Sequence, residues 1–236
     1  MRVVVTRPQA DGARTAAALE ARGHEVLLAP LLQVEGVAAD LSGAWGGVIV
    51  TSANAPGALD DAAKAALLGL PIYAVGQRSA EAARAAGFTD VTCADGDARD
   101  LVRLIAQWQI PAKAPLLYLA GEDRAADLVQ ALAARGLNAE LRVVYRAVTL
   151  PFPPELEAAL EAGDVEAVLH FSRRSAQSYV AGARDAGIAD QALAVLHYCL
   201  SEQVAEPLRA AGAGQVAVAP RPDEAALVAL LSSSPG

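Results

Sequence analysis

Several short apolar runs in this sequence end in side chains that are suited to binding an anion. Hydroxyl, amide and guanidinium groups donate hydrogen bonds, and arginine adds positive charge. Five such segments follow apolar runs: Thr6-Arg7-Pro8, Thr51-Ser52-Ala53-Asn54, Gly76-Gln77-Arg78-Ser79, Gly121-Glu122-Asp123-Arg124 and Ser172-Arg173-Arg174-Ser175. If each segment opens a helix, the free backbone N–H groups of its first turn join the same anion cradle.

The serines in these segments also have a simpler interpretation. Ser52, Ser79 and Ser172 could each be an N-cap that stabilises its helix by about 1 kcal/mol. One such position favours neither interpretation, but five similar segments in one chain favour a shared anionic ligand. We therefore expect these segments to bind a substrate or ligand with several negative charges.

The usual catalytic and metal-binding patterns are missing from the sequence. The histidines His24, His170 and His197 are far apart, and the last two lie inside strand-like runs, where a hydrogen-bonded core role is typical. No Cys/His spacing predicts zinc, and there is no Gly-x-x-x-x-Gly-Lys-Ser/Thr loop, no Gly-x-Gly-x-x-Gly after the first strand and no Gly-x-Ser-x-Gly. These absences argue against an NTPase, a common dinucleotide enzyme or a serine hydrolase. They leave an enzyme that acts mainly by holding an anionic substrate in shape, or a binding protein.

Tyr145 is a candidate for direct chemistry. It follows the strand-like run Arg142–Val144 and precedes the proline-rich segment Leu150–Pro154, which we interpret as a connector because successive prolines disfavour helix interiors and central strands. A phenol at a domain junction can donate a hydrogen bond to a leaving oxygen. The same position also suits an aromatic side chain that only packs over the junction between two domains and has no catalytic role.

An alternation of short apolar runs and helical patterns must position these groups. We expect strands at Arg2–Thr6, Glu25–Ala29, Gly47–Thr51, Ile72–Val75, Val91–Ala94, Leu116–Leu119, Glu140–Val144, Ala167–Phe171, Ala194–Tyr198 and Gln215–Ala219. We expect helices at Asp11–Arg22, Ser79–Ala86, Arg99–Trp108, Arg124–Arg135, Ala176–Ala186 and Gln203–Ala211. Several of these helices stop at glycine, which closes a helix in the left-handed conformation. This alternation predicts an α/β fold with parallel sheets and helical crossovers.

The two halves of the chain resemble each other. Ser52 aligns with Ser172 at an offset of 120 residues, and Gly87 aligns with Gly212 at an offset of 125. An offset that rises slowly is expected for an old duplication with small insertions. We therefore predict two similar lobes, flavodoxin-like in strand count, with about five strands each.

Composition and charge limit the partners. The 236 residues carry 27 acidic and 19 basic side chains, a net charge of −8, so a general nucleic-acid surface is not expected. No apolar run approaches the roughly 18 residues of a membrane span, and the N-terminus enters a strand pattern without a signal-peptide leader. Cys93 and Cys199 lie beside apolar runs, which favours buried thiols in a reducing compartment. We expect a cytoplasmic monomer without nucleic-acid or membrane partners.

A series of short motifs follows one order along the chain. They are Thr6-Arg7-Pro8, Ala29-Pro30, Val50-Thr51-Ser52-Ala53-Asn54-Ala55, Ala74-Val75-Gly76, Val144-Tyr145-Arg146 and Phe171-Ser172. Each motif alone is weak, but their order and spacing resemble those of the uroporphyrinogen-III synthase family. The resemblance extends over essentially the whole chain.

The resemblance implies a fold of two lobes, each a parallel sheet flanked by helices. The lobes are not the two sequence halves in that family. Carried over to this chain, residues 1–32 and 150–236 form one lobe and residues 38–142 the other, while residues 33–37 and 143–149 form a two-stranded linker.

The resemblance also implies an activity. Members of the family convert the linear tetrapyrrole hydroxymethylbilane to uroporphyrinogen III without a metal or a cofactor. The terminal hydroxyl leaves, and closure through a spiro intermediate inverts the last pyrrole, ring D. Because the substrate carries eight carboxylates, the anion-binding segments would hold its acetate and propionate groups, and conformational control would be the main contribution to catalysis.

Motif matching gives several residues a role. Tyr145 corresponds to the family's tyrosine that is thought to assist loss of the hydroxyl, and we expect it to be catalytic. Ser52, Ser79 and Ser172 correspond to hydroxyl positions that contact substrate. The full set of residues expected to bind substrate is Thr6, Arg7, Pro8, Thr51, Ser52, Ala53, Asn54, Gly76, Gln77, Ser79, Gly121, Arg124, Ser172, Arg173, Ser175 and Ser201.

One stretch departs from the family pattern. Where a Gly-x-Thr-Thr-Ala-like turn is usual in the C-terminal lobe, this chain reads Leu200-Ser201-Glu202-Gln203-Val204-Ala205. Ser201 replaces the glycine, Val204 replaces a threonine, and Glu202 places a carboxylate where an anionic substrate should approach. The departure leaves open a non-catalytic tetrapyrrole-binding or regulatory member of the same fold. A binding protein for a different small anion is the third alternative.

Overall fold

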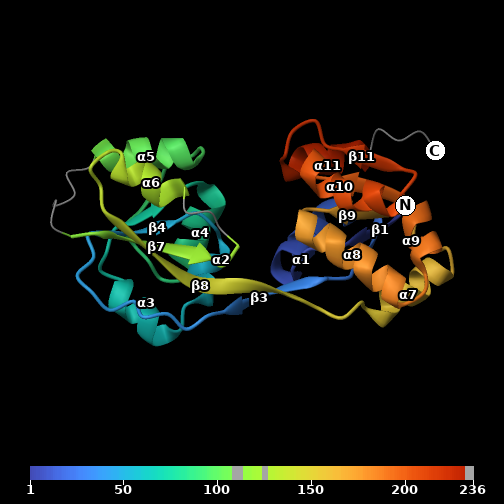
Figure 1. Ribbon diagram of the computed structural model, residues 1–236, viewed down its shortest axis with the longest axis horizontal. Coiled ribbons are helices and arrows are strands. Elements are labelled where there is room, and N and C mark those ends of the chain that lie inside the picture. The colour runs from blue at the N-terminus through green and yellow to red at the C-terminus, as the bar shows by residue number, and fades with distance from the viewer. Residues whose placement is uncertain (108–113, 124–126, 232–236) are drawn as a thin grey trace. The chain divides into compact units, whose positions relative to one another are not determined.

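Two largely parallel β-sheets, each covered by helices, organise the chain (Figure 1). The structure, a computed structural model, describes residues 1–107, 114–123 and 127–231. It divides the chain into unit 1, Met1–Gln33 with Val148–Gly236, and unit 2, Val34–Ala147. The predicted α/β class, with two similar lobes built on parallel sheets and joined by two strands, is confirmed.

The sheet of unit 1 has the order β11-β10-β9-β1-β2, and every neighbouring pair is parallel. Its strands are β1 (Arg2–Val5), β2 (Glu25–Leu28), β9 (Ala167–His170), β10 (Leu196–Cys199) and β11 (Val216–Val218). Val4 pairs with Leu27 on one side and with Val168 on the other, so the start of the chain joins its C-terminal part. When the strands of unit 1 are numbered in chain order, their order in the sheet is 2-1-3-4-5, which is the order of a flavodoxin-like sheet.

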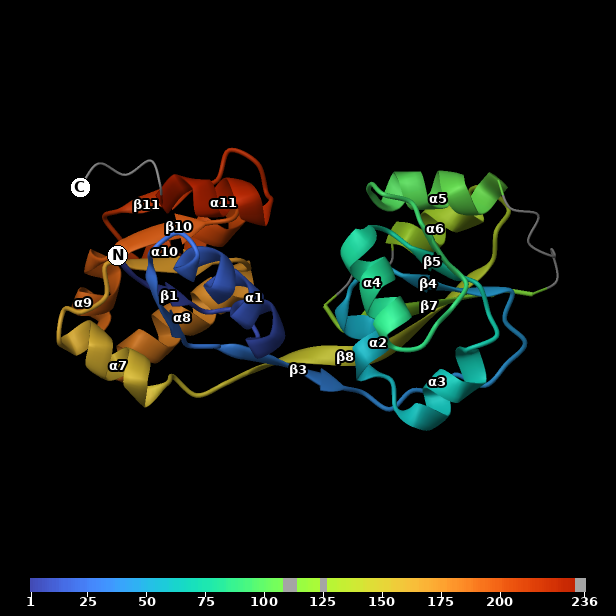
Figure 2. The same ribbon diagram turned by 180° about the vertical axis from the view of Figure 1, so that it is seen from behind.

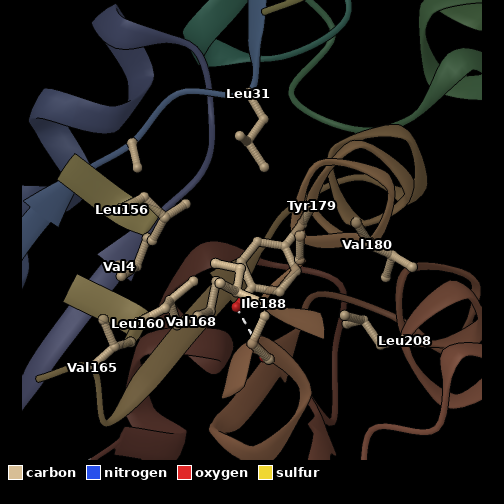
Figure 3. Close-up of a cluster of buried hydrophobic side chains, with 14 of the residues drawn as sticks. Val4, Leu31, Leu156, Leu160, Val165, Val168, Tyr179, Val180, Ile188 and Leu208 are labelled. Atoms are coloured by element: carbon tan, nitrogen blue, oxygen red, sulfur yellow. Dashed lines mark hydrogen bonds between the residues drawn. The ribbon is translucent and has the colours of Figure 1, made fainter. Parts of the chain in front are cut away.

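Helices cover both faces of this sheet. They are α1 (Gln9–Glu20), α7 (Pro154–Glu161), α8 (Arg173–Asp185), α9 (Ala189–Ala194), α10 (Glu202–Ala211) and α11 (Glu224–Leu231). Val3 and Val5 pack with α1 and α11, whereas Val4 packs with the other four helices, as the period of two along a strand requires. Figure 3 shows this second core, where the buried Tyr179 donates its hydroxyl hydrogen to the carbonyl of Ala192 at 2.9 Å.

The sheet of unit 2 has the order β3-β8-β7-β4-β5-β6. Its strands are β3 (Leu32–Gly36), β4 (Gly47–Val50), β5 (Ile72–Ala74), β6 (Val91–Cys93), β7 (Leu116–Gly121) and β8 (Ala139–Thr149). The strands from β4 to β8 are parallel. β3 runs antiparallel to β8, because Val37 N–H donates to the carbonyl of Val144 at 2.8 Å and Leu150 N–H donates to that of Leu31 at 2.9 Å. The chain passes from one unit to the other within β3 and again within β8.

The helices of unit 2 also lie on both faces of their sheet (Figure 2). They are α2 (Asn54–Ala58), α3 (Asp61–Leu67), α4 (Gln77–Ala85), α5 (Ala98–Gln107) and α6 (Asp127–Ala133). Val48 and Val50 pack with α2, α3 and α4 in one core. Ile49 and Tyr118 pack with α5 and α6 in the other.

The five parallel strands of unit 2 lie in the order β6-β5-β4-β7-β8, which corresponds strand for strand to the order β11-β10-β9-β1-β2 of unit 1, so each has a counterpart in the other sheet. β4 of unit 2 corresponds to β9 of unit 1, and β7 corresponds to β1. In each sheet the strand order reverses between these two strands. Ligands of open parallel sheets bind outside the carboxyl ends of the strands at such a reversal. A binding site is therefore expected at the segments that follow β1, β9, β4 and β7.

Candidate functional site

The carboxyl end of β9 leads into a serine-capped helix. Ser172 is the N-cap of α8, and its Oγ accepts a hydrogen bond from the backbone N–H of Ser175 at 3.1 Å. Ser175 is buried, and its hydroxyl donates to the carbonyl of Ser172 at 2.9 Å. Arg173 is exposed and forms an ion pair with Glu206 at 3.3 Å. Ser172 is therefore an N-cap, and its side chain is also partly exposed at this strand end.

Thr6 and Arg7, at the carboxyl end of β1, are held inside unit 1. Thr6 is fully buried, and its hydroxyl donates to the carbonyl of Leu169 at 3.0 Å. Arg7 is 9% exposed, and its Cζ lies 4.2 Å from the centroid of the Phe171 ring. Pro8 follows as the N-cap of α1. These contacts tie the end of β1 to the end of β9.

An ion network fixes the Arg7 guanidinium. Its Nη1 donates to Oγ1 of Thr15 at 3.1 Å and to Oε2 of Glu224 at 3.0 Å, and its Nη2 lies 3.2 Å from Oδ2 of Asp11. Burial opposes ionisation of Glu224, but hydrogen bonds from Thr15 and Arg7, together with the charges of Arg7 and Arg14, outweigh it and lower its pKa. Two carboxylates of the chain itself thus already neutralise Arg7, which we expected to bind substrate.

The carboxyl end of β4 presents a polar turn in unit 2. The hydroxyls of Thr51 and Tyr118 form a hydrogen bond of 2.9 Å. The Oγ of Ser52 accepts from the backbone N–H of Asn54 at 3.3 Å, and Ala53 holds the N-cap position of the short helix α2. All four residues from Thr51 to Asn54 are partly exposed, so this turn offers hydroxyl and amide groups at the strand end.

The carboxyl end of β5 opens helix α4. Gly76 is its N-cap, in an extended conformation, and Gln77 is exposed in the first turn. Ser79 is buried inside this turn, and its backbone N–H donates to the carbonyl of Gly76 at 3.1 Å. Ser79 is therefore not the N-cap that the sequence allowed. A Cβ at Gly76 would meet no atom within 4 Å, so the space in front of this turn is open.

Helix α10 holds the corresponding position in unit 1. Ser201 is its N-cap, but its side chain makes no capping hydrogen bond. Val204, at a position where the resemblance leads us to expect a threonine, is 5% exposed and belongs to the apolar core. Glu202 is exposed and pairs with Arg209. The departure from the family pattern therefore removes a hydroxyl from this turn and adds a carboxylate that the chain partly neutralises itself.

Tyr145 of β8 lies beside Gly121 of β7 at the carboxyl end of the unit 2 sheet. The two residues pair at a register shift between Ala120 and Gly121, and the N–H of Glu122 donates to the carbonyl of Tyr145 at 3.0 Å. The Tyr145 side chain packs into the core of unit 2 and is 8% exposed. No hydrogen bond joins its hydroxyl to another described residue, so the hydroxyl is available to a ligand.

His170 and His197 form a buried pair between the unit 1 sheet and α8. His170 Nε2 and His197 Nδ1 are 3.1 Å apart, and the ring of Tyr179 contacts both imidazoles edge to face. Burial, with a contribution from His197, lowers the pKa of His170 well below its usual value, and burial lowers that of His197 to about 4. Both rings are therefore neutral near pH 7, and their interpretation as hydrogen-bonded core residues is confirmed.

The residues expected to bind substrate form one group in each unit. In unit 1 the expected residues lie beyond the ends of β1, β9 and β10. They are Thr6, Arg7, Pro8, Ser172, Arg173, Ser175 and Ser201. In unit 2 the residues after the ends of β4 and β5 are Thr51, Ser52, Ala53, Asn54, Gly76, Gln77 and Ser79. Gly121 ends β7, and the catalytic candidate Tyr145 lies within β8 beside Gly121. Arg124 lies outside the described residues. Sequence reasoning missed Tyr118 and Glu224, because only the fold brings them to Thr51 and Arg7.

Other features of the described residues lie apart from these groups. A cavity of about 850 Å³ in unit 1 is lined by Met1, Val165 and Gln215, which precede β1, β9 and β11, so it lies at the amino-terminal edge of the sheet. Within residues 1–107, 114–123 and 127–231, no three His, Cys, Asp or Glu side chains gather as a metal site would need. None of the described helices has the length and apolarity that a membrane crossing requires.

Several known proteins resemble this chain. A family model described as Uroporphyrinogen-III synthase HemD matches residues 13–229. No curated protein matches the chain. The uroporphyrinogen-III synthetase of Helicobacter pylori is 17% identical over 99% of this chain and 99% of that chain, with a TM-score of 0.67, which shows a shared fold. Wild-type uroporphyrinogen III synthase of Thermus thermophilus is 25% identical over 99% and 96% of the two chains, with a TM-score of 0.44.

Proposed function

Because the chain belongs to the uroporphyrinogen-III synthase HemD family, we propose that it cyclises hydroxymethylbilane to uroporphyrinogen III. The observation that carries this proposal is the position of Tyr145, whose hydroxyl is free of other described residues at the carboxyl end of the unit 2 sheet. A phenol held there can donate a hydrogen bond to a departing oxygen.

The reaction begins with loss of the terminal hydroxyl of the substrate. The carbon–oxygen bond breaks, the electron pair leaves with the oxygen, and the oxygen takes a proton from solvent and departs as water. The neighbouring pyrrole nitrogen stabilises the cation that remains. Tyr145 donates to the departing oxygen and so stabilises negative charge as it develops in the transition state.

Ring closure then depends on the shape in which the substrate is held. The substituted carbon of the last pyrrole attacks the cation and forms the spiro intermediate. In this intermediate the original bond from the substituted carbon to its methylene bridge breaks, and that methylene forms a bond to the unsubstituted ring carbon of the inverted pyrrole. This carbon then loses its proton to solvent, which restores the pyrrole. Simple head-to-tail closure gives the other isomer, so the protein must hold the chain in the conformation that favours attack through the substituted carbon.

Hydroxyl and backbone donors at the strand ends would hold the carboxylates of the substrate. In unit 2 these are the side chains of Ser52 and Asn54 and the open helix turn behind Gly76. In unit 1 they are Ser172 and the first turn of α8. Neutral donors of this kind bind carboxylates without the strong charge of an arginine cluster, which is compatible with a chain of net charge −8. The proposed reaction takes place in the cytoplasm and needs neither metal nor cofactor.

A second candidate function is binding of tetrapyrroles without turnover. The first turn of α10 favours it, because Val204 is buried where the family has a hydroxyl and Glu202 adds a carboxylate. Calorimetry with uroporphyrinogen III and a turnover assay with fresh hydroxymethylbilane separate the two candidates. Binding together with formation of the type III isomer supports the synthase, and binding without any turnover supports the second candidate.

A further inference from the structure

A groove lies between helices α5 and α6 of unit 2, and none of the described candidate site residues lines it. Its volume is about 700 Å³. The two helices pack against each other over one face of the sheet, and both ribbon views show them side by side (Figure 1, Figure 2). A volume of this size is in the range of sites for small-molecule ligands.

Three exposed arginines line this groove. Arg99 and Arg103 come from α5, and Arg135 follows the end of α6. Arg103 forms an ion pair with Asp100 of its own helix. Among the described residues, the guanidinium groups of Arg99 and Arg135 take part in no ion pair. In a chain of net charge −8, these two cations form a local positive field that favours an anionic ligand.

The rest of the groove lining is apolar and small. Val102 and Leu128 line it with their side chains almost fully buried, at 4% and 6% exposure. The remaining lining residues are the alanines Ala98, Ala131 and Ala134. Short side chains leave the groove unfilled, and all three alanines are exposed. An apolar ligand body that covers their methyl groups gains from the removal of this surface from water.

We propose that the α5–α6 groove binds a small ligand with an apolar body and at least two acidic groups. One acidic group pairs with Arg99 on α5 and another with Arg135 beyond α6, while the body lies over the exposed alanines Ala98, Ala131 and Ala134. This binding is independent of the proposed cyclisation, because the groove shares no described residue with the strand-end groups and its test measures binding alone.

Fluorescence titration with bis-ANS, an apolar dye that carries two sulfonates, tests this proposal on the full chain. The double variant Arg99→Gln/Arg135→Gln should bind the dye at least about tenfold more weakly, because both charge-assisted contacts are lost. The matched control Arg22→Gln/Arg84→Gln removes two exposed arginines elsewhere and should bind like the parent. A dissociation constant for Arg99→Gln/Arg135→Gln within twofold of the control would overturn the proposal.

A second pair of variants tests the position of the dye. Ala131 is an exposed lining residue of α6, where glutamate and glutamine are both good helix formers. Ala131→Glu should weaken dye binding at least about tenfold more than Ala131→Gln, because the two differ only in charge. Equal affinities of these two variants would place the dye elsewhere and contradict the groove assignment. Far-UV circular dichroism and the unfolding midpoint confirm that each variant is folded.

Discussion

The ring of Tyr145 lies directly on the backbone of Gly121. A Cβ atom at Gly121 would be 2.5 Å from Cζ and 2.8 Å from Oη of Tyr145, closer than non-bonded carbon and oxygen atoms approach. The absence of a side chain at position 121 is therefore what lets the phenol occupy the end of the β7–β8 pair. This contact couples the stability of unit 2 to the position of its proposed catalytic group.

Substitution of Gly121 by alanine should displace the Tyr145 ring. We expect a loss of about 1–3 kcal/mol in the free energy of unfolding from overpacking, together with a fall in turnover. Gly57→Ala is the matched control, because a Cβ there meets nothing within 4 Å. Urea unfolding and initial rates on both variants measure the effect. Wild-type stability and rate in Gly121→Ala would contradict this prediction, because the Tyr145 ring would then not depend on the missing side chain at position 121.

Removal of the Tyr145 hydroxyl should affect rate and not folding. We expect Tyr145→Phe to lower kcat by about 100-fold or more with little change in KM, because the ring packing stays and the donor to the leaving oxygen is lost. Tyr179→Phe is the opposite control. Its hydroxyl donates to the carbonyl of Ala192 in the unit 1 core, so this variant should lose about 1 kcal/mol of stability and keep its kcat. An unchanged kcat in Tyr145→Phe would remove Tyr145 from the mechanism.

The His170–His197 pair should make the protein sensitive to mild acid. Both rings have lowered pKa values in the folded protein, so below the unfolded value of about 6.5 only the unfolded chain takes up their protons. Stability is then full above about pH 6.5 and falls as pH drops, at up to about 2.7 kcal/mol per pH unit for two histidines. Urea unfolding between about pH 7 and pH 5 measures this slope. His170→Asn should reduce it to about half, and a stability that stays constant over this range would refute the prediction.

The carboxylate of Glu224 should be needed to keep Arg7 in place. We expect Glu224→Gln to cost about 2 kcal/mol of unfolding free energy, because the nearly buried guanidinium then keeps, among the described residues, Asp11 alone as its counter-charge. Glu206→Gln breaks the exposed pair with Arg173 and should change stability by no more than about 0.5 kcal/mol. Equal effects of the two substitutions would mean that the Arg7 network adds no more than a surface ion pair.

Much of the fold could be predicted from local sequence patterns. Apolar runs such as Val48–Val50 mark buried strands, and the alignment of Ser52 with Ser172 correctly matches β4 with β9. Helix ends were also predictable: α10 ends at Gly212, which has a φ of 99° in the left-handed region. These features depend on residues that are close in sequence, and for that reason they can be recognised without the structure.

Other elements were missed for identifiable reasons. The proline-rich segment is the expected connector up to Pro153, but helix α7 already begins at Pro154, its first residue, a position that suits proline because no helical N–H is needed there. Helix α8 begins at Arg173 rather than at Ala176, since Ser172 caps it. The local pattern ends one strand at Val144, but β8 continues to Thr149, through the residues that the resemblance assigns to a linker strand, because pairing with β3 and not local propensity sets its length.

The candidate site was predictable only as a list of strand ends. Ser172 and Asn54 follow apolar runs, so their positions are visible in the sequence. The partners of Arg7 are not, because Glu224 lies near the other end of the chain and only the sheet brings it to β1. The packing of Tyr145 on Gly121 likewise depends on a register shift between β7 and β8, which cannot be recognised from the local sequence of either strand.

The isomer composition of the product tests the proposed synthase activity most directly. Fresh hydroxymethylbilane is incubated with the full chain, the product is oxidised to porphyrin, and the type I and type III isomers are separated by chromatography. The account predicts that type III dominates, and that the Tyr145→Phe variant shifts the product towards type I because uncatalysed closure then competes. A product that is type I in the presence of the wild-type chain, as in its absence, would contradict it.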